Sequence, residues 1–209
     1  MIKGIIYGLV LLGAVASCSE SSEQEDEYAN WKSRNEDFFC EVYQKADSTI
    51  HADGNNEEWK IIRKWSLQEQ FGSKKDNNIV AHVLEKSASL ASPIYTDSVV
   101  VDIQGRLMPT ASDKEGYIFY STFSGKERNL ESDLLITMSA NGKLKSADGK
   151  LNKVELDGLS TALQQMHVGD RWMVYVPYNL GYQGQSMPQS FVPAYSTLVF
   201  DVTLIYIKH

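Results

Sequence analysis

Apolar residues recur at intervals of three, four and seven between residues 28 and 71. Residues at this spacing lie on one side of an α-helix, so the pattern predicts an amphipathic helix. The predicted apolar stripe consists of Trp31, Phe38, Phe39, Val42, Tyr43, Ala46 and Ile50. Turn-forming residues at positions 51–56 end this helix.

A second short helix is expected at residues 57–70, with Trp59, Ile62 and Trp65 on its buried side. The polar residues 72–78 are expected to form a linker. Residues 31–78 are therefore a helical segment, which either packs on the rest of the chain or mediates self-association into a homodimer. Aromatic stripes at helical spacing more often pack within one chain.

After residue 78 the apolar period changes to two, which is typical of β-strands. Segments with this pattern lie at residues 79–84, 98–108, 116–123, 134–139, 171–176 and 196–207. In the last segment Asp201 and Thr203 lie on the face opposite to the apolar residues, which are Leu198, Phe200, Val202, Leu204 and Tyr206. One buried face and one wetter face indicate an antiparallel sheet.

Residues 158–166 have the one convincing helical pattern in this half of the chain. Its apolar side is formed by Leu156, Leu159, Leu163 and Met166, and Gly169 and Asp170 close the segment. Residues 140–151 carry Asn-Gly and Asp-Gly pairs, so a solvated hairpin is expected there. The sequence thus predicts an α+β domain at residues 79–209, with an antiparallel sheet curled around one short helix.

Composition and charge exclude several classes of protein. The chain of 209 residues has 20 Lys and Arg against 27 Asp and Glu, a net charge of −7, and therefore lacks the basic surface that binds nucleic acid. Its two cysteines cannot form a disulfide framework. No metal-ligand spacing is present among the histidines, which are His51, His82, His167 and His209. We expect neither a metal site nor a cofactor.

The N-terminus has the layout of a secretory signal, with Lys3, an apolar run at residues 4–16 and small residues before Cys18. The run is too short to span a bilayer, which takes about 20 apolar residues. Residues 15–18 read Val-Ala-Ser-Cys and also resemble the lipobox of bacterial lipoproteins, whose cysteine is diacylated and becomes the new N-terminus. The alternative is an ordinary secretory signal followed by a chance cysteine; we favour the lipobox.

Lipidation of Cys18 would make residues 1–17 a signal peptide and residues 18–30 a tether to the membrane. The tether has five acids and no base between residues 19 and 27, so it is expected to be solvated. It is either a surface-export signal, as in some Gram-negative lipoproteins, or a plain spacer. The expected location is the cell envelope, with the domain anchored by lipid to either face of the outer membrane.

Three ordered segments in the last third of the chain resemble one known family. They comprise Gly158-Leu159 with the following Met166-His167-Val168-Gly169, then Val176-Pro177-Tyr178-Asn179-Leu180-Gly181-Tyr182, then Val192-Pro193 with Ser196-Thr197-Leu198-Val199-Phe200-Asp201-Val202. Their order and spacing resemble the FKBP-type peptidyl-prolyl cis-trans isomerases. Residues 97–107 resemble the first strands of that family, and residues 116–122 resemble its flap, so the likeness covers residues 79–208.

The resemblance implies a twisted antiparallel half-barrel that wraps one short helix and holds an aromatic pocket between them. It also implies an enzyme that rotates the bond preceding proline in polypeptides, a reaction for which the family uses no nucleophile, metal or cofactor. At matching positions, Tyr182, Phe119 and Phe200 are the implied catalytic residues. Val192 and Leu156 are implied to bind substrate.

The sequence departs from the family at Ile103, Tyr120 and Leu159, where the family has a tyrosine, the flap aspartate and the tryptophan of the pocket floor. These changes leave a smaller and less polar pocket. Three hypotheses follow: an isomerase that acts on extracytoplasmic proteins, a peptide-binding or chaperone lipoprotein that keeps the fold with weakened catalysis, or a surface lipoprotein whose sheet is a scaffold. Taken singly, each pocket residue also fits ordinary core packing.

Overall fold

The computed structural model describes residues 27–67, 74–123, 128–131, 133–144 and 155–208. Its helices and strands follow one another along the chain as two α-helices, three 3₁₀ turns and seven strands. They are α1 (Trp31–Ala52), β1 (Trp59–Arg63), η1 (Lys75–Asn77), β2 (Asn78–Glu85), β3 (Ser98–Leu107), β4 (Ile118–Ser121), β5 (Ile136–Ser139), α2 (Asp157–Leu163), β6 (Arg171–Val176), η2 (Tyr178–Leu180), η3 (Pro188–Ser190) and β7 (Leu198–Lys208).

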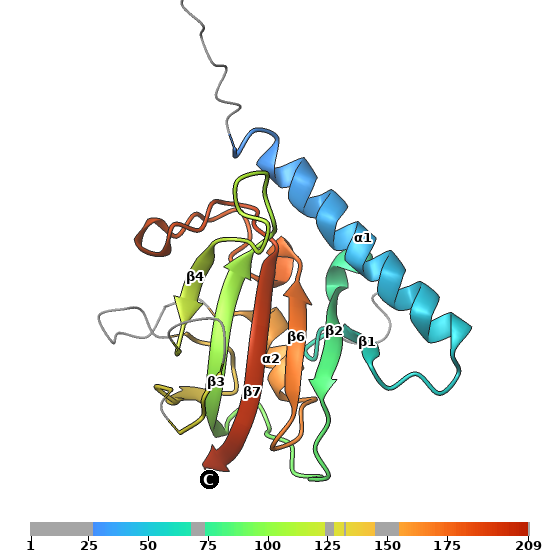
Figure 1. Cartoon of the computed structure of the whole chain (residues 1–209), viewed down its shortest axis with the longest axis vertical. Coiled ribbons are helices and arrows are strands. Elements are labelled where there is room, and N and C mark those ends of the chain that lie inside the picture. Colours follow the sequence, from blue (N-terminus) through green and yellow to red (C-terminus); the bar gives the residue numbers. More distant parts are fainter. Residues whose placement is uncertain (1–26, 68–73, 124–127, 132, 145–154, 209) are drawn as a thin grey trace, which may run out of the picture.

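The strands form one antiparallel sheet in the order β1-β2-β6-β7-β3-β4, and β5 also pairs with β3. The long central strands β3 and β7 run side by side over their whole length, from Ser98 opposite Lys208 to Leu107 opposite Leu198. Helix α2 lies behind the sheet in Figure 1, and α1 runs diagonally along its other side. The predicted α+β architecture is confirmed, and each strand expected after residue 78 is present.

The main core fills the space between α2 and the inner face of the sheet. Alternate residues of β3 and β7 point into it, including Val101 and Ile103 from β3 and Phe200 and Val202 from β7, all with no exposed surface. Helix α2 approaches the sheet closely at Gly158, where a Cβ atom would lie 2.3 Å from Cγ1 of Val176. A larger residue at this position would push the helix away from the sheet.

Helix α1 covers part of the outer face of the sheet. Its apolar stripe packs on β1, β2 and β6 in a second cluster that contains Phe39, Ala46, Trp59 and Val80, with Val42, Tyr43, Ile50, Ile61 and Tyr175 around them. The rest of the helix surface is polar, as the amphipathic pattern predicts. The predicted helix is therefore confirmed, and its stripe packs on the same chain, with Trp31 and Phe38 against the main core.

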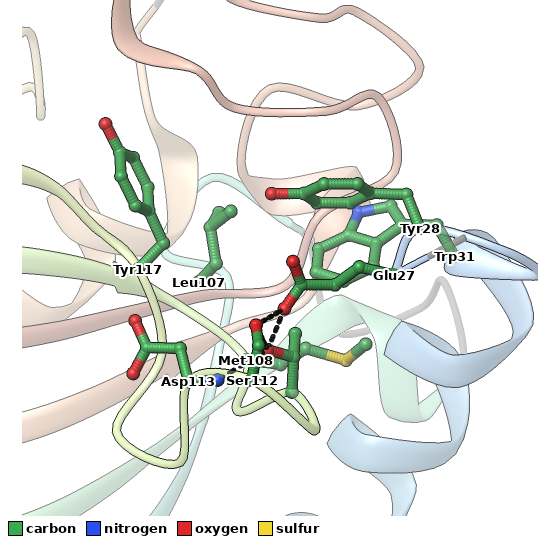
Figure 2. Close-up of a pocket in the computed structure, with 9 residues that line it drawn as sticks. Glu27, Tyr28, Trp31, Leu107, Met108, Ser112, Asp113 and Tyr117 are labelled. Atoms are coloured by element: carbon green, nitrogen blue, oxygen red, sulfur yellow. Dashed lines mark hydrogen bonds between the residues drawn. The ribbon is translucent and has the colours of Figure 1, made fainter. Parts of the chain in front are cut away.

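The N-terminal end of α1 is fixed to the loops that precede β4 and β7. Fully buried Asn35 accepts a hydrogen bond from the backbone N–H of Thr197 at 2.7 Å. The indole N–H of Trp31 donates to Ser196 Oγ at 2.9 Å. Just before the helix, the carboxylate of Glu27 accepts hydrogen bonds from the Thr110 and Ser112 hydroxyls (Figure 2).

The expected second helix at residues 57–70 is wrong, because Trp59–Arg63 forms strand β1 along the edge of β2. Trp59 and Ile61 face α1, whereas Ile62 packs on the main core. This alternation suits a strand, and the otherwise unpaired edge of β2 supplies its hydrogen bonds. Trp65, expected on a buried side, is 42% exposed.

The segment that begins at residue 140 is also less solvated than expected. Ala140 and Leu144 are 0% and 2% exposed, and both belong to the main core. Gly142 has φ +80°, which fits a turn at the Asn-Gly pair. The remainder of the expected hairpin, residues 145–154, lies outside the described residues.

Within the described ranges, no helix is long and apolar enough to cross a membrane.

Candidate functional site

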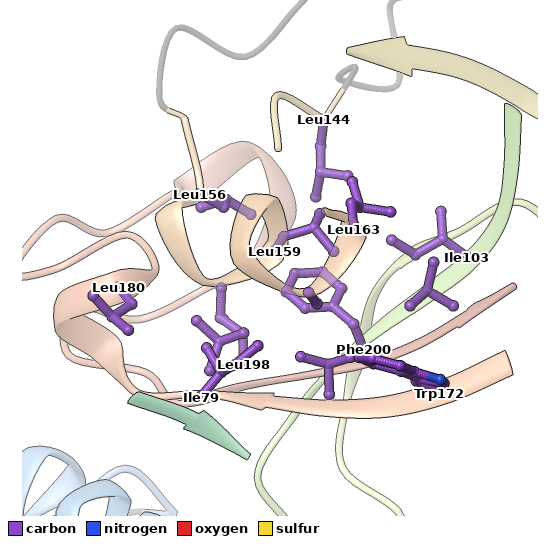
Figure 3. Packing of buried hydrophobic residues seen from close by; sticks show 14 of the residues in the cluster. Ile79, Ile103, Leu144, Leu156, Leu159, Leu163, Trp172, Leu180, Leu198 and Phe200 are labelled. Atoms are coloured by element: carbon purple, nitrogen blue, oxygen red, sulfur yellow. The ribbon is translucent and has the colours of Figure 1, made fainter. Parts of the chain in front are cut away.

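The side chains that the sequence assigns to a pocket all meet at the main core. Those buried in the cluster are Ile103, Leu156, Leu159, Tyr182, Val192 and Phe200. Phe119 and Tyr120, on β4, are partly buried and pack against the same cluster. Strands β3, β4 and β7, the start of α2 and the loop between η2 and β7 thus contribute to one site. Figure 3 shows Leu159 of α2 facing Phe200 of β7.

An aromatic pair lies at the centre of this site. The Phe119 and Phe200 rings meet edge to face, with centroids 5.8 Å apart and planes at 80°. Gly105 of β3 makes room for them, because a Cβ atom there would lie 2.6 Å from Cζ of Phe119 and 3.0 Å from Cε1 of Phe200. The glycine therefore lets the flap residue Phe119 lie against the last strand.

The floor of the site is apolar and closed. Ile103, Leu159 and Phe200 have no exposed surface. Leu156 directly precedes α2, and its backbone N–H donates a long hydrogen bond of 3.4 Å to the carbonyl oxygen of Gly142. A ligand that binds this N–H must displace that hydrogen bond.

The loop between η2 and β7 forms the rim. It carries Tyr182 and Val192, which are 4% and 1% exposed. Backbone hydrogen bonds between Met187 and Val192, of 2.8 and 3.2 Å, hold the loop in a narrow turn. Phe191, which directly precedes Val192 in this turn, has φ 54°, a left-handed conformation that bulky residues rarely adopt, and is 71% exposed.

The sequence points to the loop at residues 183–191 as either a substrate rim or a plain surface loop, without singling out Phe191. Its ring contacts Tyr117, the residue that precedes β4, with centroids 6.3 Å apart. In the sequence, Phe191 stands out only as a single large apolar residue inside a polar, proline-containing loop. This signal is weak because the loop lacks the alternation of apolar and polar residues that marks a strand.

Tyr120 places a phenol where the family that the sequence resembles has a carboxylate. The side chain is partly buried, and this burial raises the pKa of Tyr120 above its ordinary value. The phenol therefore stays uncharged at neutral pH. It can donate or accept a hydrogen bond, but it brings no charge into the pocket.

A buried ion cluster lies behind the site, on the outer face of β3 and β7. Arg128 Nη1 donates to Asp102 Oδ2 at 2.7 Å, and its Nη2 lies 2.9 Å from Asp201 Oδ1. The Arg128 side chain is 9% exposed and that of Asp102 is fully buried. Asp102 and Asp201 directly neighbour Ile103 and Phe200 in the chain. No local pattern in the sequence predicts this cluster.

The same cluster fixes the flap that carries Phe119. Thr122, at the end of the flap, donates its hydroxyl proton to Asp102 and accepts the backbone N–H of Ile103 at 2.8 Å. Arg128 lies a few residues further along the chain and also donates to Thr203 Oγ1 at 3.0 Å. The end of the flap is thereby attached to β3, and Arg128 bridges β3 and β7.

No group of His, Cys, Asp or Glu side chains that could hold a metal ion occurs among the described residues. Lipidation of Cys18, expected from the sequence, falls on a residue outside the described ranges.

Several known proteins are similar to this chain. The family model for FKBP-type peptidyl-prolyl cis-trans isomerases matches residues 91–205, more than half of the 209 residues. The macrophage infectivity potentiator of Trypanosoma cruzi is 27% identical over 166 residues, which cover 78% of this chain and 71% of that protein.

Solved structures of the same kind are also similar. A peptidyl-prolyl cis-trans isomerase from Pseudomonas syringae pv. tomato has a TM-score of 0.48 at 16% identity, over 80% of this chain and 94% of the other. FkpA from Escherichia coli has a TM-score of 0.47 at 18% identity, over 86% of this chain and 65% of the other.

The buried ion cluster leads to a prediction on stability. Arg128→Met leaves the Asp102 carboxylate buried without its cation, which should lower the free energy of unfolding by about 3–5 kcal/mol in urea titrations. The double variant Asp102→Asn/Arg128→Met removes both charges and should be more stable than the single variant. As a control, Lys86→Met breaks an exposed ion pair with Glu57 and should cost less than about 1 kcal/mol. If Arg128→Met lowers the free energy of unfolding no more than Lys86→Met does, the assignment of a buried ion pair is contradicted.

Proposed function

Because the chain belongs to the FKBP-type peptidyl-prolyl cis-trans isomerase family, we propose that it isomerises prolyl bonds in the site formed around Phe119, Tyr182 and Phe200. Proteins of this family act on proline-containing polypeptides. The observation that carries the proposal is the convergence of the implied pocket residues, from separate elements, on one apolar cluster with an aromatic pair at its centre.

Isomerisation of a prolyl bond requires an apolar environment around the amide rather than a reactive side chain. Rotation about the peptide bond has a barrier of roughly 18–20 kcal/mol because resonance is lost in the twisted form, and an uncatalysed prolyl bond isomerises in about 10–100 s. The twisted amide is less polar than the planar amide. A pocket from which water is excluded therefore favours the twisted form, and the fully buried floor at Ile103, Leu159 and Phe200 supports this role.

The pocket residues take complementary roles in this proposal. Phe119 and Phe200 hold the proline ring between them, and Val192, Leu159 and Ile103 form the walls. Polar groups at the pocket bind the substrate backbone. Tyr182 donates a hydrogen bond from its hydroxyl to a substrate carbonyl oxygen.

The N–H of Leu156 binds a second carbonyl oxygen once its 3.4 Å hydrogen bond to Gly142 is displaced. Tyr120 offers a neutral phenol at the mouth of the pocket.

Substrate entry requires the rim to open. The floor residues have no exposed surface, so a proline ring reaches them after Val192 moves outward. Val192 lies at the base of the turn, directly after the exposed Phe191, and the strands of the sheet are far more extensively paired than this turn. We therefore assign the opening motion to this loop.

A second candidate function is peptide binding or chaperoning with weakened catalysis. It is favoured by the apolar side chains of Ile103 and Leu159 and the neutral phenol of Tyr120, which leave fewer groups to bind the substrate carbonyls. Such a protein would bind unfolded chains and suppress their aggregation without accelerating isomerisation.

The isomerase proposal is tested with a protease-coupled assay on a short proline peptide, using the chain that starts after Cys18. We expect acceleration over buffer, and a loss of about twofold to tenfold in kcat/KM for Tyr182→Phe, which removes one hydrogen bond. Tyr206→Phe, at a 45% exposed position of β7, should be neutral. If the protein suppresses aggregation of an unfolded client but does not accelerate isomerisation, the chaperone function replaces the isomerase function.

We further propose that the protein is anchored by lipid on Cys18 and acts on proteins outside the inner membrane. The apolar run that ends in small residues before Cys18 supports this location. Several acyl chains bind a bilayer firmly, whereas one chain alone binds only marginally. The acidic residues 19–26 would then hold the domain off the surface of the outer membrane. Glu27, which the sequence placed in this tether, is instead bonded to Thr110 and Ser112 of the domain.

Lipid anchoring predicts the behaviour of two cysteine variants in cells. Cys18→Ser should abolish incorporation of labelled palmitate and move the protein from the membrane fraction to the soluble fraction. The control Cys40→Ser changes the other cysteine, which is unpaired in the first helix, and should leave both unchanged. Equal labelling of the Cys18→Ser variant would refute lipidation at this residue.

Homodimerisation through the N-terminal helix stays a prediction of the sequence. Because the apolar stripe of α1 is covered by the chain's own sheet, such a dimer would have to use the polar outer side of the helix. A light-scattering mass of two chains would support the dimer, and a mass of one chain would refute it.

A further inference from the structure

A small cavity lies between the start of α1 and the loop that joins β3 to β4 (Figure 2). Its volume is about 180 Å³, below the roughly 300–1,000 Å³ of pockets that hold whole small molecules. A cavity of this size fits one side chain. It is lined by Glu27, Tyr28, Trp31, Leu107, Met108, Thr110, Ser112, Asp113 and Tyr117.

Aromatic rings and carboxylates surround this cavity. Tyr28 and Trp31 meet edge to face with centroids 5.0 Å apart, and Tyr117 lies on the opposite side in Figure 2. The carboxylates are those of Glu27 and Asp113. Ring faces attract cations, and carboxylates add to this attraction where the site is partly shielded from water.

The charges around the cavity favour a cation. Hydrogen bonds from Ser112 and Thr110 lower the pKa of Glu27, so this carboxylate is ionised at neutral pH. Burial raises the pKa of Tyr28, and the charge of Glu27 raises it further.

Arg34 offsets this negative charge only in part. Its Nη1 donates to the backbone carbonyl oxygens of Glu27 and Ala29, at 2.7 and 3.4 Å. Its guanidinium lies 5.7 Å from the centre of the Trp31 ring. The ring thus already takes part in one cation contact, and Arg34 is not among the residues that line the cavity.

The cavity adjoins the proposed isomerase pocket. Tyr117 precedes Phe119 by two residues and contacts Phe191, which is next to Val192 at the rim. Trp31 is bonded to Ser196 on the same loop. A polypeptide with its proline in the pocket can therefore place a neighbouring side chain in the cavity.

We propose that this cavity is a subsite for a lysine or arginine side chain of the polypeptide whose prolyl bond is isomerised. The inference rests on the proposed function and adds a preference for basic residues near the proline. Glu27 and Asp113 supply the charge, and Tyr28, Trp31 and Tyr117 supply the ring faces.

The test uses proline peptides in which one lysine is moved through the positions on either side of the proline. Each is compared with the same peptide carrying uncharged norleucine. Both kcat/KM and binding, followed by chemical-shift titration, are measured at low salt. One position should favour lysine by about threefold to tenfold, and 0.5 M salt should reduce this preference because it screens exposed charges.

Two matched variants test whether the preference for lysine arises in this cavity. Glu27→Gln/Asp113→Asn keeps the hydrogen-bond acceptors of both side chains and removes both charges, so the lysine preference should fall to about one while norleucine peptides are unaffected. Glu41→Gln removes a charge from the exposed side of α1 and should retain the preference.

Failure of the subsite and failure of the isomerase give different results. Turnover of norleucine peptides with no lysine preference at any position, or a preference that survives in the double variant, overturns the subsite alone. No turnover of any peptide overturns the isomerase. In that case, lysine-dependent shifts at Tyr28 and Tyr117 would still uphold the cavity as a cation site, and their absence would overturn it.

Discussion

The central strand pair β3 and β7 must bury both of its faces, and the rest of the molecule is arranged around this constraint. On the inner face Ile103 and Phe200 contribute to the proposed pocket, and on the outer face their neighbours Asp102 and Asp201 bind Arg128. A buried carboxylate is tolerated only with a cation and hydrogen bonds. Asp102, whose charge Arg128 neutralises, also accepts a hydrogen bond from Thr122 at the end of the flap.

Helix α1 buries the outer face of the other half of the sheet. It covers β1, β2 and β6 on the outer face, so that the sheet is packed on both sides where α2 lies behind it. The start of α1 is bonded through Asn35 to the loop that carries the pocket rim. The helical segment is therefore part of the structure that surrounds the site, and it contributes Glu27, Tyr28 and Trp31 to the adjoining cavity.

Much of this arrangement could be predicted from local sequence patterns. The strands after residue 78 follow a period of two, and the ordered segments around Gly169, Tyr182 and Phe200 point to side chains that meet in the main core. Strand β1 could not be predicted, because five residues with two adjacent isoleucines fit a helix turn as well as a strand until the edge of β2 is present. Arg128 pairs with residues distant in the chain, for which no local pattern exists.

In the proposed mechanism, an uncharged, water-excluding pocket performs the reaction without acid or base catalysis. Phe119, Phe200, Ile103 and Leu159 do not titrate, and burial moves the pKa of Tyr120 further above neutrality. The most direct test is the pH dependence of kcat/KM for a proline peptide without ionisable side chains, from about pH 5 to pH 9. This mechanism predicts that kcat/KM does not change over this pH range. A bell-shaped profile, or a step near neutral pH with the fold intact, would contradict it.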